Sequence, residues 1–541
     1  MKKIYTKILC FFVACSFVAC DDFLSEYSQD MTVLSNVTHC DELLLGSIYV
    51  PKALVYYPTG TRSCGFFNIL DDDISTAKGG DGVTSTVPYN LHACVDGNFG
   101  YYAWQPEVGM KHDGNRNDDD ATWNDLYKRI NYVNVLLDEM IEIPHETDEE
   151  NATYYRVQGE AHFLRAQFYF ILANLYGKPY HASTAAKELC VPLKLTPYVE
   201  HDQEKETQFQ RATVKEIYDQ VLVDLTRAVE YLTLSPQNAK NRFHRASAEA
   251  ANLLLSRVYL YMQDWEKAGD AAAEVIKSKN FRLAGLSLFD NAEFLNKSNP
   301  EVIFSQGQNN FPLSDGVGDD AFTPLSAYAG SYCVSLDLVR LYDLENDKRA
   351  NFFVLAGSGF QQGECDSIAL AYKFDAYLNS AARYSDVFGM RLSEAYLNRM
   401  EACAMQGDET TANELLNELR ENRINNYVDV TYTGAELVSQ IRDERRKELC
   451  FEGHRWFDLR RYSVNDIHPY SKPIVHVMNV VNGKGNNTQT RTYVLQPGDD
   501  AYTFAIPAKV LEFDKVGMGT NKRPKRPSLE ELTGEENENK E

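Results

Sequence analysis

The sequence lacks the short motifs that mark common hydrolytic and metal-dependent enzymes. It contains no HExxH segment, no GxSxG segment and no pair of cysteines spaced as CxxC. These absences argue, in that order, against a zincin protease, an α/β-hydrolase nucleophile and a structural zinc site. The histidines are scattered without ligand spacing, and the dispersed cysteines are expected to be mostly buried thiols rather than a disulfide framework. We therefore expect neither a metal nor a cofactor.

Positive charge is also scarce. The 541 residues include 54 Lys and Arg against 78 Asp and Glu, which gives a formal net charge of -24. This charge would repel nucleic acid and anionic lipid alike, and no basic stripe is present on which phosphates could bind. Hydrophobic residues make up 44% of the chain and aromatic residues 12%, enough for a large core. The composition indicates a folded, soluble body without nucleic-acid partners.

The first twenty residues have the organisation of an exported lipoprotein. Three lysines precede a nearly all-apolar run over residues 8–18, and Ala19 precedes Cys20. The apolar run is too short to span a bilayer, so we predict a signal peptide over residues 1–19 and lipidation of Cys20. The alternative is an unlipidated secretory signal in which the cysteine only ends the apolar run. With lipids on Cys20, no other membrane segment is needed.

A helical period dominates much of the chain. Apolar residues recur at three- and four-residue steps over 123–141, and the pattern continues over 160–173, so both segments are predicted to be helices. Thr213, followed three residues later by Glu216, predicts a capping box at the start of a helix that reaches residue 232.

Two further segments have the form of helical hairpins. Residues 250–262 and 267–276 flank a tight connection around Trp265, and residues 394–405 and 412–420 repeat the plan. The pattern resembles a tetratricopeptide repeat. Because such hairpins cannot bury their apolar faces alone, they are predicted to stack on the other helices in one curved scaffold.

The segments between the helices have a different composition. Residues 51–118 and 285–390 are rich in Gly, Pro, Asp and aromatic residues without a sustained period, so they are predicted to be long functional loops with short strands. Residues 521–541, rich in Lys, Pro, Glu and Asn, are predicted to form a flexible, solvated tail. The expected fold is mainly α, with tetratricopeptide-like hairpins in a curved scaffold and loop-rich insertions that carry short strands.

Several sequence blocks follow one another in a recognisable order. The most specific is a charged block that reads ERRKELCFEGHRWFDLRRY, and the full set lies at 20–24, 164–180, 245–265, 391–402, 444–462 and 506–507. Together these blocks resemble the SusD/RagB family of outer-membrane nutrient-binding lipoproteins. The resemblance covers almost the whole mature chain. It implies a single helical domain over residues 20–520, with an N-terminal part over about 20–300 and a C-terminal part over about 301–520.

The charged block at 444–462 is interpreted as structural. Arg445 and Glu448 lie three residues apart and Glu448 and Glu452 four apart, which suits ion pairs along a helix and to neighbouring elements. Acidic runs at 71–73 and 118–120 leave a carboxylate pair for glycoside hydrolysis conceivable, but acidic runs in loops usually form turns. A glycoside hydrolase is therefore the less favoured alternative, and no catalytic residue is assigned.

The family resemblance implies a binding function without bond breaking. It implies that the protein captures an oligosaccharide or polysaccharide at the cell surface and delivers it to a SusC-like, TonB-dependent outer-membrane barrel, on which it sits as a lid. The alternative is a structural helical adaptor or lid for that barrel without glycan affinity of its own. The implied partners are the barrel and a glycan, with the outer membrane contacted through the lipid anchor alone.

A sugar site of this kind needs exposed aromatic side chains, because the C–H groups of a sugar ring stack on an aromatic face. The segment from Tyr101 to Trp104 is the best candidate, and it resembles the position from which family members present a stacking Trp. Burial of Trp104 in the core is the alternative, since large aromatic residues are mostly buried. The resemblance also implicates an acidic loop and a second loop region, so the predicted carbohydrate-binding residues are Trp104, Tyr102, Tyr101, Asp73, Asp72, Tyr328 and Tyr332.

Overall fold

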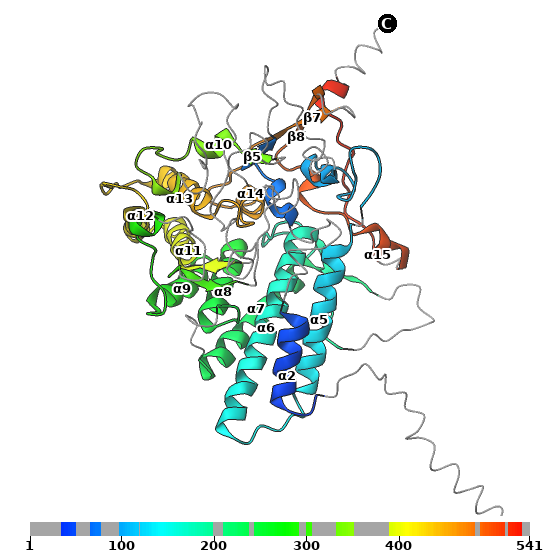
Figure 1. Cartoon of the computed structure of the whole chain (residues 1–541), viewed down its shortest axis with the longest axis vertical. Helices are drawn as coiled ribbons and strands as arrows, with labels where there is room; N and C mark the ends of the chain where they lie inside the picture. Colours follow the sequence, from blue (N-terminus) through cyan, green and yellow to red (C-terminus); the bar gives the residue numbers. More distant parts are fainter. Residues whose placement is uncertain are drawn as a thin grey trace, which may run out of the picture.

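The structure is a computed structural model (Figure 1). It describes residues 34–49, 65–76, 97–117, 119–197, 209–236, 243–290, 299–305, 332–350, 389–481, 487–513 and 518–532. The predicted signal peptide over 1–19 and the predicted lipid site at Cys20 lie outside these ranges. None of the helices within them is both long and apolar enough to cross a membrane.

Three long helices form one end of the molecule (Figure 1). They are α5 (Ala121–Glu139), α6 (Asp148–Tyr176) and α7 (Val214–Leu234). The predicted capping box is confirmed, because the Thr213 side chain accepts from the Glu216 backbone N–H and the Glu216 carboxylate accepts from the Thr213 backbone N–H. From residue 157 onward α6 is buried on every side, as expected of a helix packed between α5 and α7.

The two predicted hairpins are confirmed as helix pairs. The first consists of α8 (Ala248–Met262) and α9 (Trp265–Lys277), and the second of α11 (Leu392–Met405) and α12 (Glu409–Glu421). Helix α9 packs on α11, so the hairpins stack on each other although more than one hundred residues separate them in the sequence. Helix α8 packs on α7, which joins this stack to the long helices.

The charged block spans two helices and the turn between them. Helix α13 (Gly434–Leu449) packs on α11, and α14 (Arg455–Ser463) follows after a turn. In this turn Phe451 and Gly453 have φ angles of 63° and 76°. Left-handed backbone at these two positions interrupts the α-helix between α13 and α14, so the block is not one continuous helix.

Short strands and helices lie between and beyond the long helices. The described strands form four two-stranded antiparallel sheets: β1 (Ile74–Thr76) with β5 (Tyr332–Val334), β2 (Leu189–Pro192) with β3 (Arg211–Thr213), β4 (Val302–Phe304) with β6 (Met390–Arg391), and β7 (Ile474–Val481) with β8 (Asn487–Leu495). The short helices are α2 (Val37–Leu43), η1 (Leu44–Ile48), η2 (Gly65–Ile69), α4 (Phe99–Tyr102), η4 (Leu286–Asp290), α10 (Leu336–Val339), η7 (Asp500–Tyr502) and α15 (Ala508–Phe513). The mainly helical fold class is confirmed.

The predicted C-terminal tail is packed over much of its length. The Asn521 side-chain amide donates to the backbone oxygens of Tyr176 and Phe504, both at 2.7 Å. Ser528 is fully buried, and Arg526 donates to the Val494 oxygen at 2.7 Å. The prediction of a solvated tail is therefore wrong at Asn521, Arg526 and Ser528, whose side chains are held against the body, whereas Lys522 and Lys525 are exposed. Residues 533–541 lie outside the described ranges.

The cysteines of the described ranges behave as small core residues. Cys40, Cys190, Cys403 and Cys450 are all buried thiols. Burial is the main cause that raises the pKa of Cys190 to about 12, which keeps this thiol protonated and unreactive.

Candidate functional site

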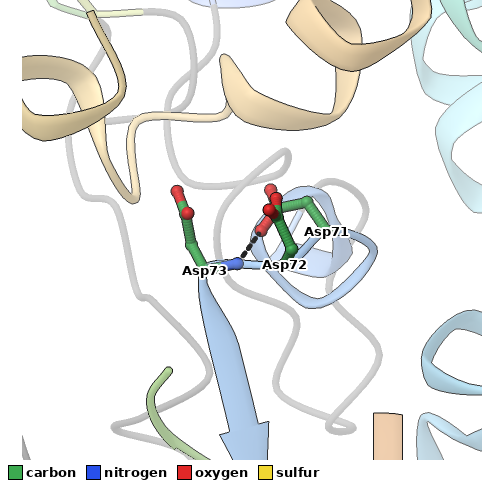
Figure 2. A group of neighbouring side chains, drawn as sticks. All are labelled: Asp71, Asp72 and Asp73. Carbon is green, nitrogen blue, oxygen red and sulfur yellow. Dashed lines mark hydrogen bonds between the residues drawn. The ribbon is translucent and has the colours of Figure 1, made fainter. Parts of the chain in front are cut away.

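The acidic loop, defined as Asp71–Asp73, lies between η2 and β1. All three side chains are buried, at 2%, 8% and 1% exposure. The Asp73 backbone N–H donates to the Asp71 carboxylate at 2.9 Å (Figure 2), which forms a tight Asx turn. The turn places the three side chains on the same side of the loop (Figure 2).

Asp72 is the most strongly paired member of the acidic loop. Arg455 binds both of its oxygens, at 2.7 and 2.9 Å. Arg446 and Lys472 add ion pairs at 3.0 and 2.7 Å. Burial alone would raise the pKa of Asp72, but the Arg455 and Arg446 guanidinium groups outweigh it and hold the pKa well below its ordinary value. Asp72 is therefore a buried anion neutralised from α13, α14 and the segment that follows α14.

The pKa values of the two flanking carboxyl groups, Asp71 and Asp73, are raised instead of lowered. Asp73 pairs with Arg446 at 2.6 Å, yet burial raises its pKa despite this guanidinium, with help from the Asp72 charge. Burial and the neighbouring Asp73 and Asp72 charges raise the pKa of Asp71 well above its ordinary value. The loop thus favours one firmly ionised carboxylate beside groups that hold protons more readily.

A cluster of three carboxyl groups is also the type of site that binds a cation. The acidic loop offers three oxygens within 4.8 Å of one another, and oxygen ligands suit calcium or magnesium. However, Arg455, Arg446 and Lys472 already bring three positive charges to these oxygens. We therefore interpret the acidic loop as an ion-pair cluster.

The aromatic loop, defined as Tyr101–Trp104, consists of the end of α4 and the two residues after it, and it packs directly against the acidic loop. Trp104 is fully buried, and its indole Nε1 donates to the Leu70 backbone oxygen at 2.9 Å. Its φ angle of 48° is in the left-handed region, which a bulky residue adopts only where surrounding contacts over-determine it. Tyr102 is also fully buried, and its hydroxyl donates to the Val477 oxygen at 2.9 Å.

His476, on β7, joins the aromatic loop to the acidic loop. Its ring stacks between Tyr102 and Trp104, with ring centroids 4.3 Å away on both sides. Its Nδ1 lies 2.7 Å from the Tyr102 backbone oxygen and its Nε2 lies 2.8 Å from the Asp71 backbone oxygen. We call this meeting point of the acidic loop, the aromatic loop and β7 the junction.

The structure therefore brings four of the predicted residues together, but it buries their side chains away from solvent. They are Asp72, Asp73, Tyr102 and Trp104. The predicted exposure of Trp104 and Tyr102 is wrong, and the alternative of core burial holds. Their polar atoms bind backbone carbonyls and their ring faces are covered by His476. The carboxylates of Asp72 and Asp73 are likewise engaged by arginines rather than open to a sugar hydroxyl.

Tyr101 differs from its neighbours because its side chain is only partly buried. Its ring stacks on Phe66 at 4.4 Å with an interplanar angle of 10°. Tyr332 lies on β5, where its backbone is the partner of Thr76 at the far end of β1, the strand that follows the acidic loop. Its side chain lies outside the described part of the chain. Tyr328 is wholly outside the described residues.

The sequence gives no sign that His476, Arg455, Arg446 and Lys472 belong to this part of the molecule. The two arginines were noticed within the charged block, but 373 residues separate Arg446 from Asp73. A lone histidine on a strand gives no local signal of its partners. Only the fold brings these residues together.

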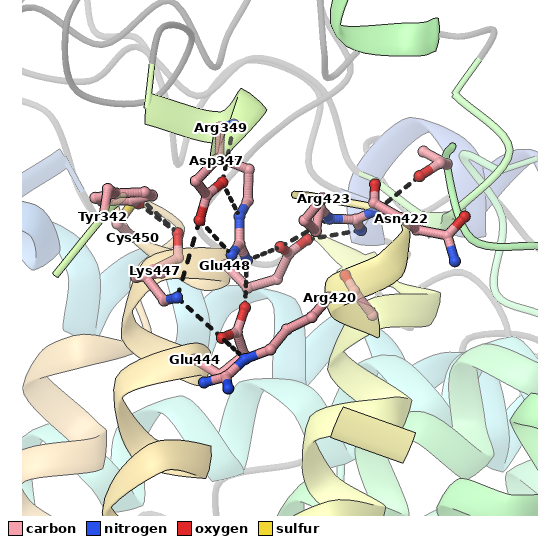
Figure 3. A network of polar contacts seen from close by, with 12 residues as sticks. Tyr342, Asp347, Arg349, Arg420, Asn422, Arg423, Glu444, Lys447, Glu448 and Cys450 are labelled. Atoms are coloured by element: carbon pink, nitrogen blue, oxygen red, sulfur yellow. Dashed lines mark hydrogen bonds and ion pairs between the residues drawn. The ribbon is translucent and has the colours of Figure 1, made fainter. Parts of the chain in front are cut away.

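A second cluster, the arginine–glutamate core, is formed by the end of α13 and the elements around it (Figure 3). Glu448 accepts from Arg391, Arg349 and Arg423 at 2.6, 2.8 and 3.0 Å. Glu444 pairs with Arg349 and Arg420 at 2.7 and 2.8 Å. Both carboxylates are fully buried.

These contacts support the structural interpretation of the charged block, with one correction. The block forms ion pairs mostly with neighbouring elements rather than along its own helix. Arg445 does not pair with Glu448 as the spacing suggested. It donates instead to Asp458 at 2.8 Å and to Asn398 at 2.7 Å, because its side chain faces α14 and α11.

The stacked hairpins define a tetratricopeptide-like helical scaffold. A family model described as "Starch-binding associating with outer membrane" matches residues 70–260, and the SusD family model matches residues 370–512. The two matches together cover more than half of the chain. The chain belongs to the SusD/RagB family.

Individual relatives have low sequence identity to this chain but match it over about two thirds of its length. The chain is 24% identical over 413 residues to SusD-like protein P38 of Formosa agariphila, covering 67% of this chain and 74% of the relative. It is 24% identical over 411 residues to the starch-binding protein SusD of Bacteroides thetaiotaomicron, covering 64% and 71%.

Solved structures show the same fold. A SusD superfamily protein from Bacteroides thetaiotaomicron superposes with a TM-score of 0.65 at 22% identity, covering 90% of this chain and all of that one. A structure described as a putative sugar binding protein from Bacteroides vulgatus gives a TM-score of 0.65 at 21% identity, covering 91% and 99%.

Proposed function

We propose that the protein is a cell-surface lipoprotein that captures a glycan and delivers it to a SusC-like, TonB-dependent outer-membrane transporter. The observation that carries this proposal is the pair of family matches, one of which is described as starch-binding and associated with the outer membrane. The printed name of one relative, the starch-binding protein SusD, agrees with it. The glycan remains to be identified.

The attachment to the membrane is part of the same proposal. Residues 1–19 would direct export, and lipids on Cys20 would hold the body at the outer membrane without a spanning helix. The sequence before Cys20 supports this attachment.

We place the glycan-binding surface beside Tyr101. Its neighbours Tyr102 and Trp104 are fixed in the junction, so the aromatic loop holds Tyr101 on a rigid base, as a preorganised site requires. In this proposal Trp104, Tyr102, Asp72 and Asp73 position the surface, while Tyr101 contacts the sugar. Tyr328 and Tyr332 remain proposed as further stacking residues.

Affinity electrophoresis in gels that contain soluble polysaccharides tests this surface. We expect the wild-type protein to be retarded by at least one polysaccharide. Tyr101→Ala should weaken that binding about tenfold, because an aromatic contact contributes about 1 kcal/mol or slightly more. Tyr155→Ala is the matched control, since Tyr155 is a partly buried tyrosine on α6. Equal retardation of wild type and Tyr101→Ala would contradict the assignment of Tyr101.

The other two functions have distinct outcomes. A structural adaptor would show no binding on a glycan array while the transporter still co-purifies with it. A glycoside hydrolase would release reducing ends from the polysaccharide that it binds. We expect retardation without any release of reducing ends.

A further inference from the structure

His476 has a hydrogen-bonding arrangement that a neutral imidazole cannot satisfy. Both of its ring nitrogens face backbone carbonyl oxygens, at 2.7 Å for Tyr102 and 2.8 Å for Asp71. A neutral ring carries one N–H donor and one lone pair, whereas an imidazolium carries two donors. In the neutral form, one nitrogen lone pair would point at a carbonyl oxygen within hydrogen-bond distance, and this contact is repulsive.

We propose that His476 is held as an imidazolium and acts as a latch between the aromatic loop and the acidic loop. Each N–H of the charged ring donates to one of these loops, so one side chain from β7 fixes both. The two stacked neighbours suit the same charge state, because Tyr102 and Trp104 present their ring faces at 4.3 Å on either side. A cation between aromatic faces is stabilised by the ring quadrupoles.

The surroundings of His476 act on its charge in opposite directions. Their balance lowers the pKa of His476, because desolvation penalises the charged form and is the largest effect, and the Tyr102 and Asp71 carbonyls and the Asp72 carboxylate oppose it only in part. The latch rests on the geometry against this net direction, since two donors are needed to satisfy two carbonyls at 2.7 and 2.8 Å. Among the described elements packed against the ring, the titratable groups are Asp71 and Asp72 of the acidic loop, Tyr102 beside it and Tyr493 opposite it on β8.

The latch gives the junction a defined pH dependence. A group whose pKa is raised on folding contributes stability that is complete below its unfolded pKa, about 6.5 for histidine, and is lost as pH rises through the folded pKa. Deprotonation would leave one loop without its donor. This inference goes beyond the proposed function, because it concerns the unliganded protein and needs no glycan.

Selective ¹⁵N labelling of the histidines in the full chain tests the latch directly. The ring nitrogens of His476 should both show the shifts of protonated nitrogens at about pH 7, with a midpoint above the roughly 6.5 of an unfolded histidine. The resonance is assigned by its absence from His476→Gln. Should that variant not fold, neutron diffraction of wild-type crystals locates the deuterons on the two nitrogens instead. A ring that is neutral at about pH 7 by either method overturns the proposal.

Chemical denaturation provides a second test of the latch. The stability advantage of wild type over His476→Gln should be largest below about pH 6.5 and should shrink as the pH rises. Asp71→Asn keeps the accepting carbonyl but removes the nearest raised carboxyl group, so its stability should retain the same pH dependence on the alkaline side. Loss of that dependence would assign the titration to Asp71, and it would contradict a histidine latch. Neither result depends on whether a glycan binds.

Discussion

Glu448→Gln should lower the free energy of unfolding by about 3–5 kcal/mol. Glu448 is fully buried and accepts from Arg349, Arg391 and Arg423. Removing its charge leaves three guanidinium groups in the arginine–glutamate core with one fewer anion. The cost of breaking a buried ion pair by neutralising one partner is mostly the desolvation of the charges that stay behind.

Denaturant unfolding of wild type and variant measures this loss. Glu436→Gln is the matched control, because Glu436 is exposed on the same helix α13 and surface substitutions usually change stability by less than about 0.5 kcal/mol. Similar stabilities for Glu448→Gln and wild type would show that the core tolerates the missing charge, contrary to our account.

The contribution of Glu448 should also depend on pH in a predictable direction. Burial alone would raise its pKa, but Arg423 and Arg391 hold the pKa well below its ordinary value. Its stabilising effect is therefore complete above the unfolded pKa of about 4.3 and is lost as the pH falls through the folded pKa. The difference between wild type and Glu448→Gln should shrink on strong acidification and stay constant around neutral pH.

Trp104→Ala should also cost about 3–5 kcal/mol of stability, because it removes a fully buried indole from the junction. Tyr102, Leu70 and His476 would face the cavity. Trp104→Phe should cost less, since it keeps most of the volume and loses chiefly the hydrogen bond from Nε1 to Leu70.

Measuring stability and glycan binding on the same samples separates a core role from a contact role. If Trp104 positions the aromatic loop from the core, Trp104→Ala loses stability and Trp104→Phe keeps most of the binding. An alanine variant as stable as wild type that no longer binds glycan would place Trp104 at the surface and contradict the structure.

Local sequence patterns were enough to predict the scaffold. The capping box of Thr213 and Glu216 and the hairpin around Trp265 each depend on residues a few positions apart. Their physical cause lies within one helix or one turn. The prediction of a mainly helical, hairpin-based fold succeeded for this reason.

Burial and long-range pairing could not be predicted in the same way. The segment from Tyr101 to Trp104 has the composition of an exposed aromatic loop, yet Trp104 is covered by His476, which is 372 positions away. The sequence alone does not show that the carboxylates of the acidic loop are paired. The fold brings Arg446 to Asp73 and Arg455 to Asp72. The C-terminal residues 521–532 are polar, but the carbonyls that they bind belong to distant segments.

Purification of the tagged, full-length protein from detergent-solubilised outer membranes tests the central proposal most directly. Mass spectrometry should identify a TonB-dependent barrel in stoichiometric amount, and the Cys20→Ser variant should leave the membrane fraction. Recovery of the protein from membranes without any barrel would contradict a role in delivering a captured glycan to an outer-membrane transporter.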